Sequence, residues 1–320
     1  MTKGTLIYNP VAGRRPGRRE REVRRAAAVL RQAGLEIELA PTVRPDMAHE
    51  LAQAAVAAGA EVVLACGGDG TINEVINGLA PHPVPLAILP GGTANILAHE
   101  LRLPLSPVRA ARQFMRWKPR RIALGRARWM RPPTRGESSP QPCCRYYTSV
   151  AGAGYDAQVV YKLSAWLKTH FGVTGYVMEA LRQWARYSFP EFSCRLDGLE
   201  RRATFAVIHR TRLYAGWLHL APTADLFAPH LAVCSFPSRR RWRYLLYAAA
   251  VLLRQHLRLR DVRLDQCAEA VCTPVDPATT IYFELDGELV GALPATFEIV
   301  PDALTLLAPE GGNGKRRTGG

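Results

Sequence analysis

The residue types best suited to chemistry lie in a glycine-rich turn, Gly67-Gly68-Asp69-Gly70-Thr71. An apolar run at 62–66 precedes the turn, and apolar residues on one helical face follow it, so the pattern predicts a strand, a turn and a helix. Glycines let backbone N–H groups approach a phosphate closely, and a helix N-terminus favours negative charge. The Asp69 carboxylate is placed to hold a metal ion. The turn therefore predicts a site for a nucleotide phosphate.

Two other segments place short polar residues directly after a predicted strand. Asn9 is followed by Pro10 and Gly13, which suits a turn that hydrogen-bonds a base, ribose or phosphate, although an ordinary strand-to-helix turn explains it as well. Pro90-Gly91-Gly92-Thr93-Ala94-Asn95 repeats the design of the first glycine turn. Its short polar residues either cap the next helix or bind a ligand. The arginines after Gly13 either neutralise phosphates or form a solvated helix start: Arg14, Arg15, Arg18 and Arg19.

A pair of carboxylates follows a β-prone run near the C-terminus, in Asp286-Gly287-Glu288. By itself this sequence is typical of a hairpin turn. Carboxylates also orient and deprotonate a hydroxyl acceptor, or coordinate magnesium, in phosphoryl transfer. The residues alone leave both interpretations open.

Strand and helix patterns alternate in the first part of the chain, which predicts a parallel sheet covered by helices. Strands are expected near 5–8, 35–40, 62–66 and 86–89, and helices near 18–33, 46–58, 71–79, 93–101 and 107–117. Gly34 and Gly59 are expected to end helices, and Asp46 to cap one. Ligands bind beyond the carboxyl ends of strands in such sheets, so the three loops are expected to converge on one crevice.

The rhythm changes after Pro119. Residues 126–142 are rich in proline and predict a mobile loop. Further on, short β-prone runs predict a mostly β second domain with a helical insertion: 146–151, 192–197, 203–208, 230–236, 279–285, 295–300 and 303–308. Helical patterns occupy 156–187 and 240–257.

Composition limits the classes of protein that remain. The 320 residues favour about two domains, and a net charge of +15 predicts attraction to nucleic acid, anionic membranes or phosphorylated substrates. Seven cysteines without metal or disulfide spacing indicate reduced thiols, and the start of the chain shows no signal peptide, so a cytoplasmic location is expected. The longest apolar run, 245–253, is far shorter than the roughly 20 residues of a membrane span. Any membrane contact should therefore be peripheral.

Two helical segments allow more than one interpretation. Residues 240–257 place one tryptophan, several leucines and an alanine on one face: Trp242, Leu245, Leu246, Ala249, Leu252 and Leu253. This face either docks on a bilayer or packs on the β domain. Residues 161–187 carry a similar ambiguity, and their glycines suggest a flap.

Five ordered motifs, spread over residues 4–308, resemble the diacylglycerol kinase catalytic family of lipid kinases. They are the Asn9 turn, the Gly67 turn with Asn73-Glu74-Val75 and Asn77-Gly78-Leu79, the Pro90 loop, Ala151-Gly152 with Gly154 and Asp156-Ala157, and Asp286-Gly287-Glu288. The resemblance implies an α/β nucleotide-binding domain at 1–122, a β-rich lipid-substrate domain at 123–293 and the active site in the cleft between them. Strands at 294–309 would return to the first domain, and 310–320 would be a disordered tail.

The resemblance also implies an enzyme that transfers the γ-phosphoryl group of ATP, with Mg²⁺, to a hydroxyl of diacylglycerol or a related lipid at the inner membrane surface. Asp286 would be the general base with Glu288 beside it, and Asp69 would place Mg²⁺ and compete for the catalytic role. The nucleotide would be bound by Asn9, Gly13, Gly67, Gly68, Gly70, Thr71, Gly91, Gly92, Thr93 and Asn95.

Two departures from the family pattern accompany these matches. His209-Arg210-Thr211 and Ala215-Gly216-Trp217 stand where an Asn-Gly pair and a glycine run are common, which predicts altered contacts in the cleft. After Ala221-Pro222-Thr223-Ala224 the acidic pair of many bacterial members is missing, which predicts a weak or absent structural Mg²⁺ site. Acceptor preference is therefore open.

Other functions remain possible on the residues alone. An NAD kinase-like enzyme shares the Gly67 turn and would act on a soluble acceptor, but it lacks the Pro90 loop and the terminal Asp-Gly-Glu. A non-catalytic nucleotide- or lipid-binding protein is favoured by the altered segments and disfavoured by the retained carboxylates. No nucleic-acid recognition motif is found.

Overall fold

The computed structural model describes residues 2–13, 16–133, 137–162, 178–214 and 218–310. The predictions for Arg14, Arg15, the middle of the 161–187 flap, residues 215–217 and the C-terminal tail lie outside the described residues. The chain divides into two compact units, here called the first unit (1–122 with 302–320) and the second unit (123–301).

A parallel sheet forms the middle of the first unit, in the order β2-β1-β3-β4 followed by the end of β18. The strands are β1 (Thr2–Tyr8), β2 (Leu35–Pro41), β3 (Val62–Gly67), β4 (Leu86–Pro90) and β18 (Ala295–Ala308). Strand β3 is buried throughout, as expected for a strand covered on both faces. Because β2 and β3 flank β1, the strand order reverses there, which places a ligand crevice at the carboxyl ends of β1 and β3.

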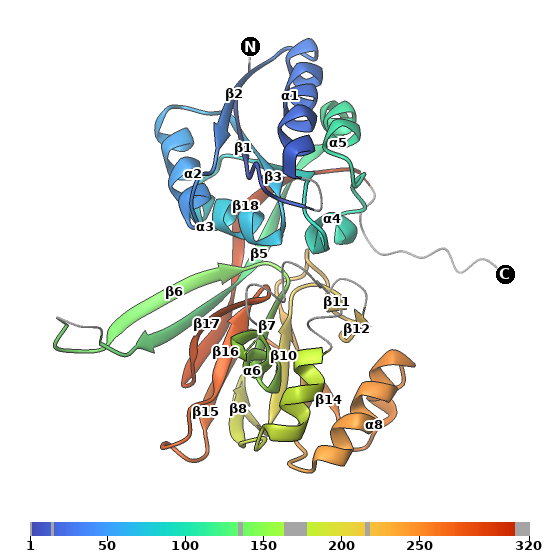
Figure 1. The fold of residues 1–320 in the computed structure, drawn as a ribbon. Coiled ribbons are helices and arrows are strands. Elements are labelled where there is room, and N and C mark those ends of the chain that lie inside the picture. The colour runs from blue at the N-terminus through green and yellow to red at the C-terminus, as the bar shows by residue number, and fades with distance from the viewer. Residues whose placement is uncertain (1, 14–15, 134–136, 163–177, 215–217, 311–320) are drawn as a thin grey trace. The chain divides into compact units, whose positions relative to one another are not determined.

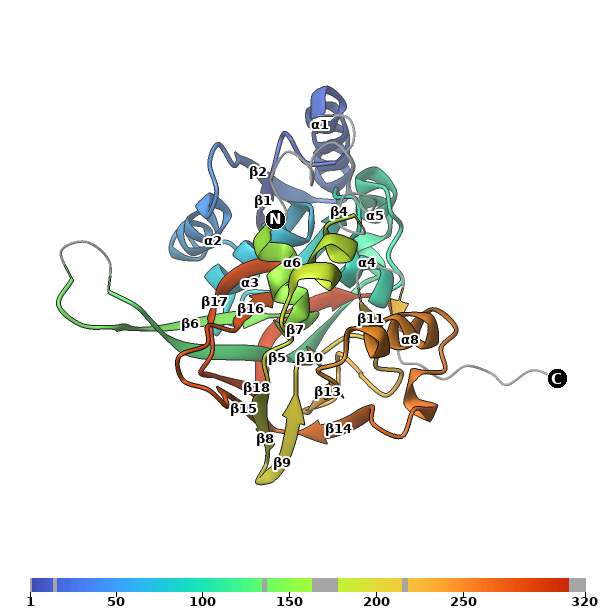
Figure 2. The same cartoon turned by 60° about the horizontal axis from the view of Figure 1, so that its bottom comes forward.

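Helices cover both faces of this sheet (Figures 1 and 2): α1 and α5 lie together on one face, and α2 and α3 on the other. The helices are α1 (Pro16–Gln32), α2 (Met47–Ala57), α3 (Asp69–Leu79), α4 (Ile96–Glu100), α5 (Pro107–Gln113) and the 3₁₀ turn η1 (Phe114–Arg116). Gly34 and Gly59 follow α1 and α2 with φ of 93° and 78°, as predicted for helix ends. Asp46 precedes α2, but the expected side-chain cap is absent because its φ of 61° turns the residue out of capping geometry.

The second unit is β-rich, with a core between two layers of strands. One layer is the antiparallel sheet β14-β13-β10-β7-β16-β17, and the other contains β9, β8, β15 and the first part of β18. Apart from β18, the strands of the second unit are β5 (Lys118–Arg131), β6 (Gln141–Tyr147), β7 (Val150–Gly154), β8 (Phe192–Leu196), β9 (Leu199–Ala203), β10 (Phe205–His209), β11 (Leu213–Tyr214), β12 (Leu218–His219), β13 (Leu231–Phe236), β14 (Arg263–Cys267), β15 (Glu269–Pro274), β16 (Tyr282–Leu285) and β17 (Glu288–Ala292). Its helices are α6 (Tyr155–Lys162), a helix at 178–186, α8 (Arg241–Leu252) and the 3₁₀ turn η2 (His256–Arg258).

The prediction of a loop at 126–142 is wrong at both of its ends, because residues 126–131 and 141–142 belong to strands β5 and β6. Strands β5 and β6 pair as a long antiparallel hairpin, from Gly125 opposite Tyr147 to Arg131 opposite Gln141. Pro142 is tolerated in β6 because this strand pairs with β5 alone, and an edge strand does not need every N–H in a ladder, while Pro132, Pro133 and Pro140 lie outside the strands. Sequence composition hid the strands because proline is rare in paired strands.

Candidate functional site

In the first unit, the loops after β1, β3 and β4 meet. The N–H of Asn9 donates to the carbonyl of Cys66 (3.1 Å), and the N–H of Gly91 donates to the carbonyl of Gly67 (3.0 Å). The Oδ1 of Asn9 accepts the N–H of Val11 (3.0 Å), which rigidifies the first turn. The structure thus brings together the three loops that the sequence places at strand ends.

Glycines permit this convergence because the loops pack backbone against backbone. A Cβ on Gly92 would lie 2.4 Å from the Cα of Gly68, and one on Gly13, whose φ is 83°, would lie 2.9 Å from the carbonyl oxygen of Gly91. A Cβ on Gly67 would strike the buried side chain of Thr71 at 2.6 Å. A side chain at Gly13 or Gly92 would therefore separate two loops, and one at Gly67 would displace Thr71 at the start of α3.

Asp69 joins the first glycine loop to the second. Its Oδ2 accepts the N–H of Asn95 (3.0 Å) and its Oδ1 accepts the N–H of Ile96 (2.7 Å), both at the start of α4. The Asn95 side chain closes the loop on itself, because Oδ1 accepts the N–H of Gly92 (2.8 Å) and Nδ2 donates to the carbonyl of Gly92 (3.0 Å). Thr93 is exposed.

The surroundings of Asp69 can be compared with the needs of Mg²⁺. Each carboxylate oxygen has more than one lone pair, so acceptance of a backbone N–H leaves capacity for a metal ion. Mg²⁺ is commonly held by one or two carboxylates together with substrate phosphates and water. Within the described residues, no three His, Cys, Asp or Glu side chains group to hold a metal ion by themselves. Asp69 therefore fits Mg²⁺ that arrives with a nucleotide.

A cavity of about 250 Å³ adjoins the second glycine loop. It is lined by Arg18, Arg19, Glu22, Pro90, Gly91, Gly92, Leu105, Ser106 and Pro107. Arg19 donates to the carbonyl of Gly91 and pairs with Glu22 (2.9 Å). Arg18 also pairs with Glu22 (3.4 Å), so an anion in this cavity would meet two guanidinium groups and one carboxylate beside the glycine backbone. Two of the four arginines noted in the sequence thus lie beside the candidate phosphate site.

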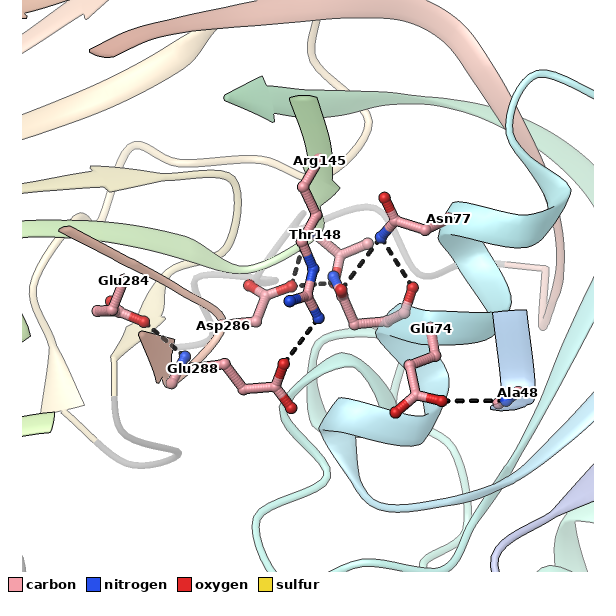
Figure 3. A network of polar contacts seen from close by, with 10 residues as sticks. Ala48, Glu74, Asn77, Arg145, Thr148, Glu284, Asp286 and Glu288 are labelled. Carbon is pink, nitrogen blue, oxygen red and sulfur yellow. Dashed lines mark hydrogen bonds and ion pairs between the residues drawn. The ribbon is translucent and has the colours of Figure 1, made fainter. Parts of the chain in front are cut away.

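Helix α3 continues the glycine loop, and several of its motif residues have structural contacts (Figure 3). Glu74 accepts the N–H of Ala48 at the start of α2 (3.1 Å), and Asn77 donates to the carbonyl (2.9 Å) and side chain (3.1 Å) of Asn73. A Cβ on Gly78 would lie 2.5 Å from the carbonyl of His49, so Gly78 lets α2 and α3 pack closely. These motif residues fix the helix that begins at Asp69.

In the second unit, Asp286 and Gly287 form the tight turn between β16 and β17, with φ of 51° and 84°. Both φ values are positive, as in the primed turns of hairpins. The Asp286 carboxylate reaches across to the chain before β7 (Figure 3). Its Oδ2 accepts the N–H of Thr148 (2.9 Å) and the Thr148 hydroxyl (3.3 Å), and its Oδ1 accepts the N–H groups of Ser149 (2.8 Å) and Val150 (2.9 Å).

Burial and these hydrogen bonds act in opposite directions on the pKa of Asp286. Asp286 is half-buried, and burial raises the pKa of its carboxyl above the ordinary aspartate value. The three N–H groups act in the opposite direction without reversing the shift. Glu288 is half-exposed and pairs with Arg145 (2.7 Å), a contact that no sequence signal indicated.

Glu284 is a buried carboxylate that the sequence analysis did not single out. It accepts the N–H of Gly287 (2.6 Å) and so supports the Asp286 turn. A Cβ on Gly152 would lie 2.6 Å from both the Oδ2 of Asp156 and the Oε1 of Glu284, so the Gly152 motif makes room for two acidic side chains. Burial, followed by the nearby Asp156 charge, raises the pKa of Glu284 well above its ordinary value.

The altered segment His209-Arg210-Thr211 is entirely buried and contacts the chain segment that binds the Asp286 carboxylate. The N–H of Arg210 donates to the carbonyl of Ser149 (2.8 Å), while its guanidinium donates to the carbonyls of Ala123 (3.1 Å), Leu226 (2.7 Å) and His230. Burial lowers the pKa of Arg210 to about 10 and that of His209 to about 3. These residues position the backbone that holds Asp286.

Residues 3–127 match the model of the diacylglycerol kinase catalytic domain, and residues 149–308 match that of the YegS C-terminal NAD kinase beta sandwich-like domain. The chain belongs to the diacylglycerol kinase catalytic-domain family. Family membership, predicted from the five motifs, is confirmed, as is a fold with an α/β part followed by a β-rich part. Membership implies a kinase that uses ATP.

Curated relatives of this family align over nearly the full chain. A diacylglycerol kinase of Mycobacterium tuberculosis (strain CDC 1551 / Oshkosh) is 29% identical, over 97% of this chain and 96% of the relative. That of Bacillus subtilis (strain 168) is 26% identical, over 93% of each chain. The crystal structure of a diacylglycerol kinase from Bacillus anthracis str. Sterne is 20% identical, with a TM-score of 0.70 over 96% of this chain and 97% of that one. The structural likeness supports the fold.

Proposed function

We propose that this protein is an ATP-dependent lipid kinase that transfers the γ-phosphoryl group of MgATP to a hydroxyl of diacylglycerol or a related lipid. The supporting observation is the convergence of three glycine-containing loops at the β1–β3 switch point, in a chain of the diacylglycerol kinase family. Backbone N–H groups, a helix N-terminus and a nearby guanidinium pair suit a polyphosphate.

In this proposal the three loops bind MgATP together. Asp69 binds the Mg²⁺ that accompanies ATP, which neutralises charge on the phosphates. The nucleotide is held by Asn9, Gly13, Gly67, Gly68, Gly70, Thr71, Gly91, Gly92, Thr93 and Asn95. Such a site accelerates phosphoryl transfer mainly by positioning and by stabilising charge.

Asp286 is the proposed general base. As the lipid hydroxyl oxygen bonds to the γ-phosphorus, the bond from that phosphorus to the bridging β-phosphate oxygen breaks, ADP leaves, and the hydroxyl proton passes to Asp286. Burial that raises the pKa of Asp286 makes it a stronger base than an exposed aspartate. Glu288, beside it and paired with Arg145, would orient the acceptor.

We also propose that residues 1–122 bind the nucleotide, that 123–293 bind the lipid, and that 294–309 return to the first domain. None of the helices in the described part of the chain is long and apolar enough to span a bilayer. The proposed location is cytoplasmic, peripheral at the inner membrane surface, in phospholipid metabolism.

The test uses the purified chain, γ-labelled ATP, Mg²⁺ and a panel of diacylglycerol, sphingoid base and phosphatidylglycerol in mixed micelles, with NAD as a soluble acceptor. Labelled lipid that is lost in Asp69→Ala and in Asp286→Asn is the expected result. Labelled NAD would instead support the NAD kinase-like alternative. ATP binding without any labelled acceptor would support a non-catalytic binding protein.

A further inference from the structure

Helix α8 exposes the apolar face that the sequence had allowed to pack on the β domain. Trp242 is 74% exposed, Leu246 43% and Leu253 71%. The opposite face, with Tyr244 and Tyr247, is the buried one. The alternative in which the tryptophan and leucine face packs on the β domain is therefore wrong, and this apolar face is left toward solvent.

The contacts of Tyr244 and Tyr247 explain why α8 buries its tyrosine face and exposes its tryptophan and leucine face. Tyr244 shares a hydrogen bond with the hydroxyl of Thr204 (2.6 Å), and Tyr247 donates to Asp261 (2.5 Å). Both rings pack in a cluster that includes Val150, whose N–H contacts Asp286. The packed face is thus secured by aromatic contacts and by hydrogen bonds, which leucines cannot form.

The helix at 178–186 extends the exposed apolar area. Trp184 stacks edge-on against Trp242, with ring centroids 5.5 Å apart, and donates from Nε1 to the carbonyl of Arg241 (2.8 Å). Met178 and Leu181 on the same helix are both more than half exposed. The term tryptophan face is used below for the exposed apolar residues of both helices: Met178, Leu181, Trp242, Leu245, Leu246, Leu252 and Leu253.

Positive charge surrounds the tryptophan face. Residues 239–260 contain no Asp or Glu and seven arginines: Arg239, Arg240, Arg241, Arg243, Arg254, Arg258 and Arg260. Arg243 pairs with Asp261 (2.7 Å) and thereby anchors the helix, while the other six are exposed. On the neighbouring helix, Arg186 adds exposed positive charge, and Arg182 is exposed but pairs with Glu179 (3.9 Å).

We propose that the tryptophan face docks the protein on an anionic lipid bilayer. The choice of a bilayer as the partner rests on the proposed lipid kinase function. An amphipathic helix with tryptophan and leucine on one side and arginines at its borders suits the interface between headgroups and acyl chains. A second copy of the chain fits less well, because two such arginine-rich faces would repel each other. A nucleic acid would match the charge but not the apolar residues.

The experiment is flotation of the full chain with vesicles of phosphatidylcholine alone or of equal parts phosphatidylcholine and phosphatidylglycerol. The wild type should float with the anionic vesicles and bind the neutral ones much less. Leu246→Glu with Leu253→Glu should lower partitioning onto anionic vesicles about tenfold or more. Leu199→Glu is the control, at a leucine at the start of β9 whose exposure of 47% is close to that of Leu246, and this variant should bind as the wild type does.

Two further measurements separate the possible failures. Thermal unfolding of the double variant should match the control, since both changes are on exposed positions. Activity on a monomeric short-chain diacylglycerol should be the same in the double variant and the wild type. If the wild type binds vesicles but does not turn over this substrate, the kinase proposal is refuted and the docking proposal stays supported. Undiminished flotation of the double variant overturns the docking proposal. The docking proposal is also overturned if the wild type is a dimer in solution and the double variant is a monomer.

Discussion

Replacement of Asp286 by asparagine exchanges one carboxylate oxygen for an amide N–H₂ in a side chain that accepts four hydrogen bonds. The better orientation keeps the amide oxygen on Ser149 and Val150. The amide nitrogen then faces Thr148. It can donate to the Thr148 hydroxyl, but it cannot accept the backbone N–H of Thr148, because both groups are donors. Asp286→Asn therefore leaves one backbone N–H without its acceptor.

The size of the effect follows from these contacts. An enclosed N–H without an acceptor costs about 1–3 kcal/mol, and loss of the negative charge weakens each remaining bond by about 1 kcal/mol. Part of this is regained because the variant no longer encloses a charge, whose burial raises the pKa of Asp286. We expect a net loss of about 2–3 kcal/mol in the free energy of unfolding, or a fall of about 5–10 °C in Tm for a unit of this size.

The assay measures stability and catalysis separately. Urea and thermal unfolding give the first, and kcat below the unfolding range of the variant gives the second. The folded variant should lose about 10²–10⁴-fold in kcat if Asp286 is the base. Asp276→Asn, at an exposed turn of the same unit, is the control and should change neither quantity much. Unchanged stability would refute the hydrogen-bond reasoning, and near-normal kcat in the folded variant would refute the base assignment.

Three other changes test the surrounding structure. Gly92→Ala should weaken ATP binding about tenfold or more by calorimetry, since its Cβ would lie 2.4 Å from the Cα of Gly68. A Cβ on Gly17 meets nothing, so Gly17→Ala should bind ATP normally. Equal ATP affinities of the two variants would contradict this. The folded protein binds a proton at Glu284 more tightly than the unfolded chain does, so the free energy of unfolding should fall as pH rises from the ordinary glutamate range through the raised pKa. Glu284→Gln should flatten that slope in urea titrations, and an unchanged slope would exclude Glu284 as its source. Arg210→Met should lower the free energy of unfolding in urea by about 3–5 kcal/mol, because two buried carbonyls and one part-buried carbonyl lose their donor. A loss no larger than that of an exposed arginine would show that those bonds contribute little.

The sequence by itself determined the first unit well. Alternating apolar runs and amphipathic segments specify strands and helices locally, and short connections between them require a parallel sheet. Once β1, β3 and β4 are neighbours, their carboxyl-end loops must meet, so the convergence of Asn9, Gly67 and Gly91 followed from order along the chain. Glycine at positions 91 and 92 is a local signal, because a Cβ there would press on the backbone of Gly67 and Gly68.

Tertiary structure alone decided the features that depend on contacts between distant residues. The Arg145–Glu288 pair joins residues 143 positions apart, and Glu284 meets Asp156 only because β7 and β16 are paired. Helix α8 is apolar on two faces, so its periodicity could not say which face is buried. The hydroxyl partners of Tyr244 and Tyr247 decided it, and they come from other parts of the fold. Periodicity reports what one element can bury, whereas the partner that buries it is a property of the whole chain.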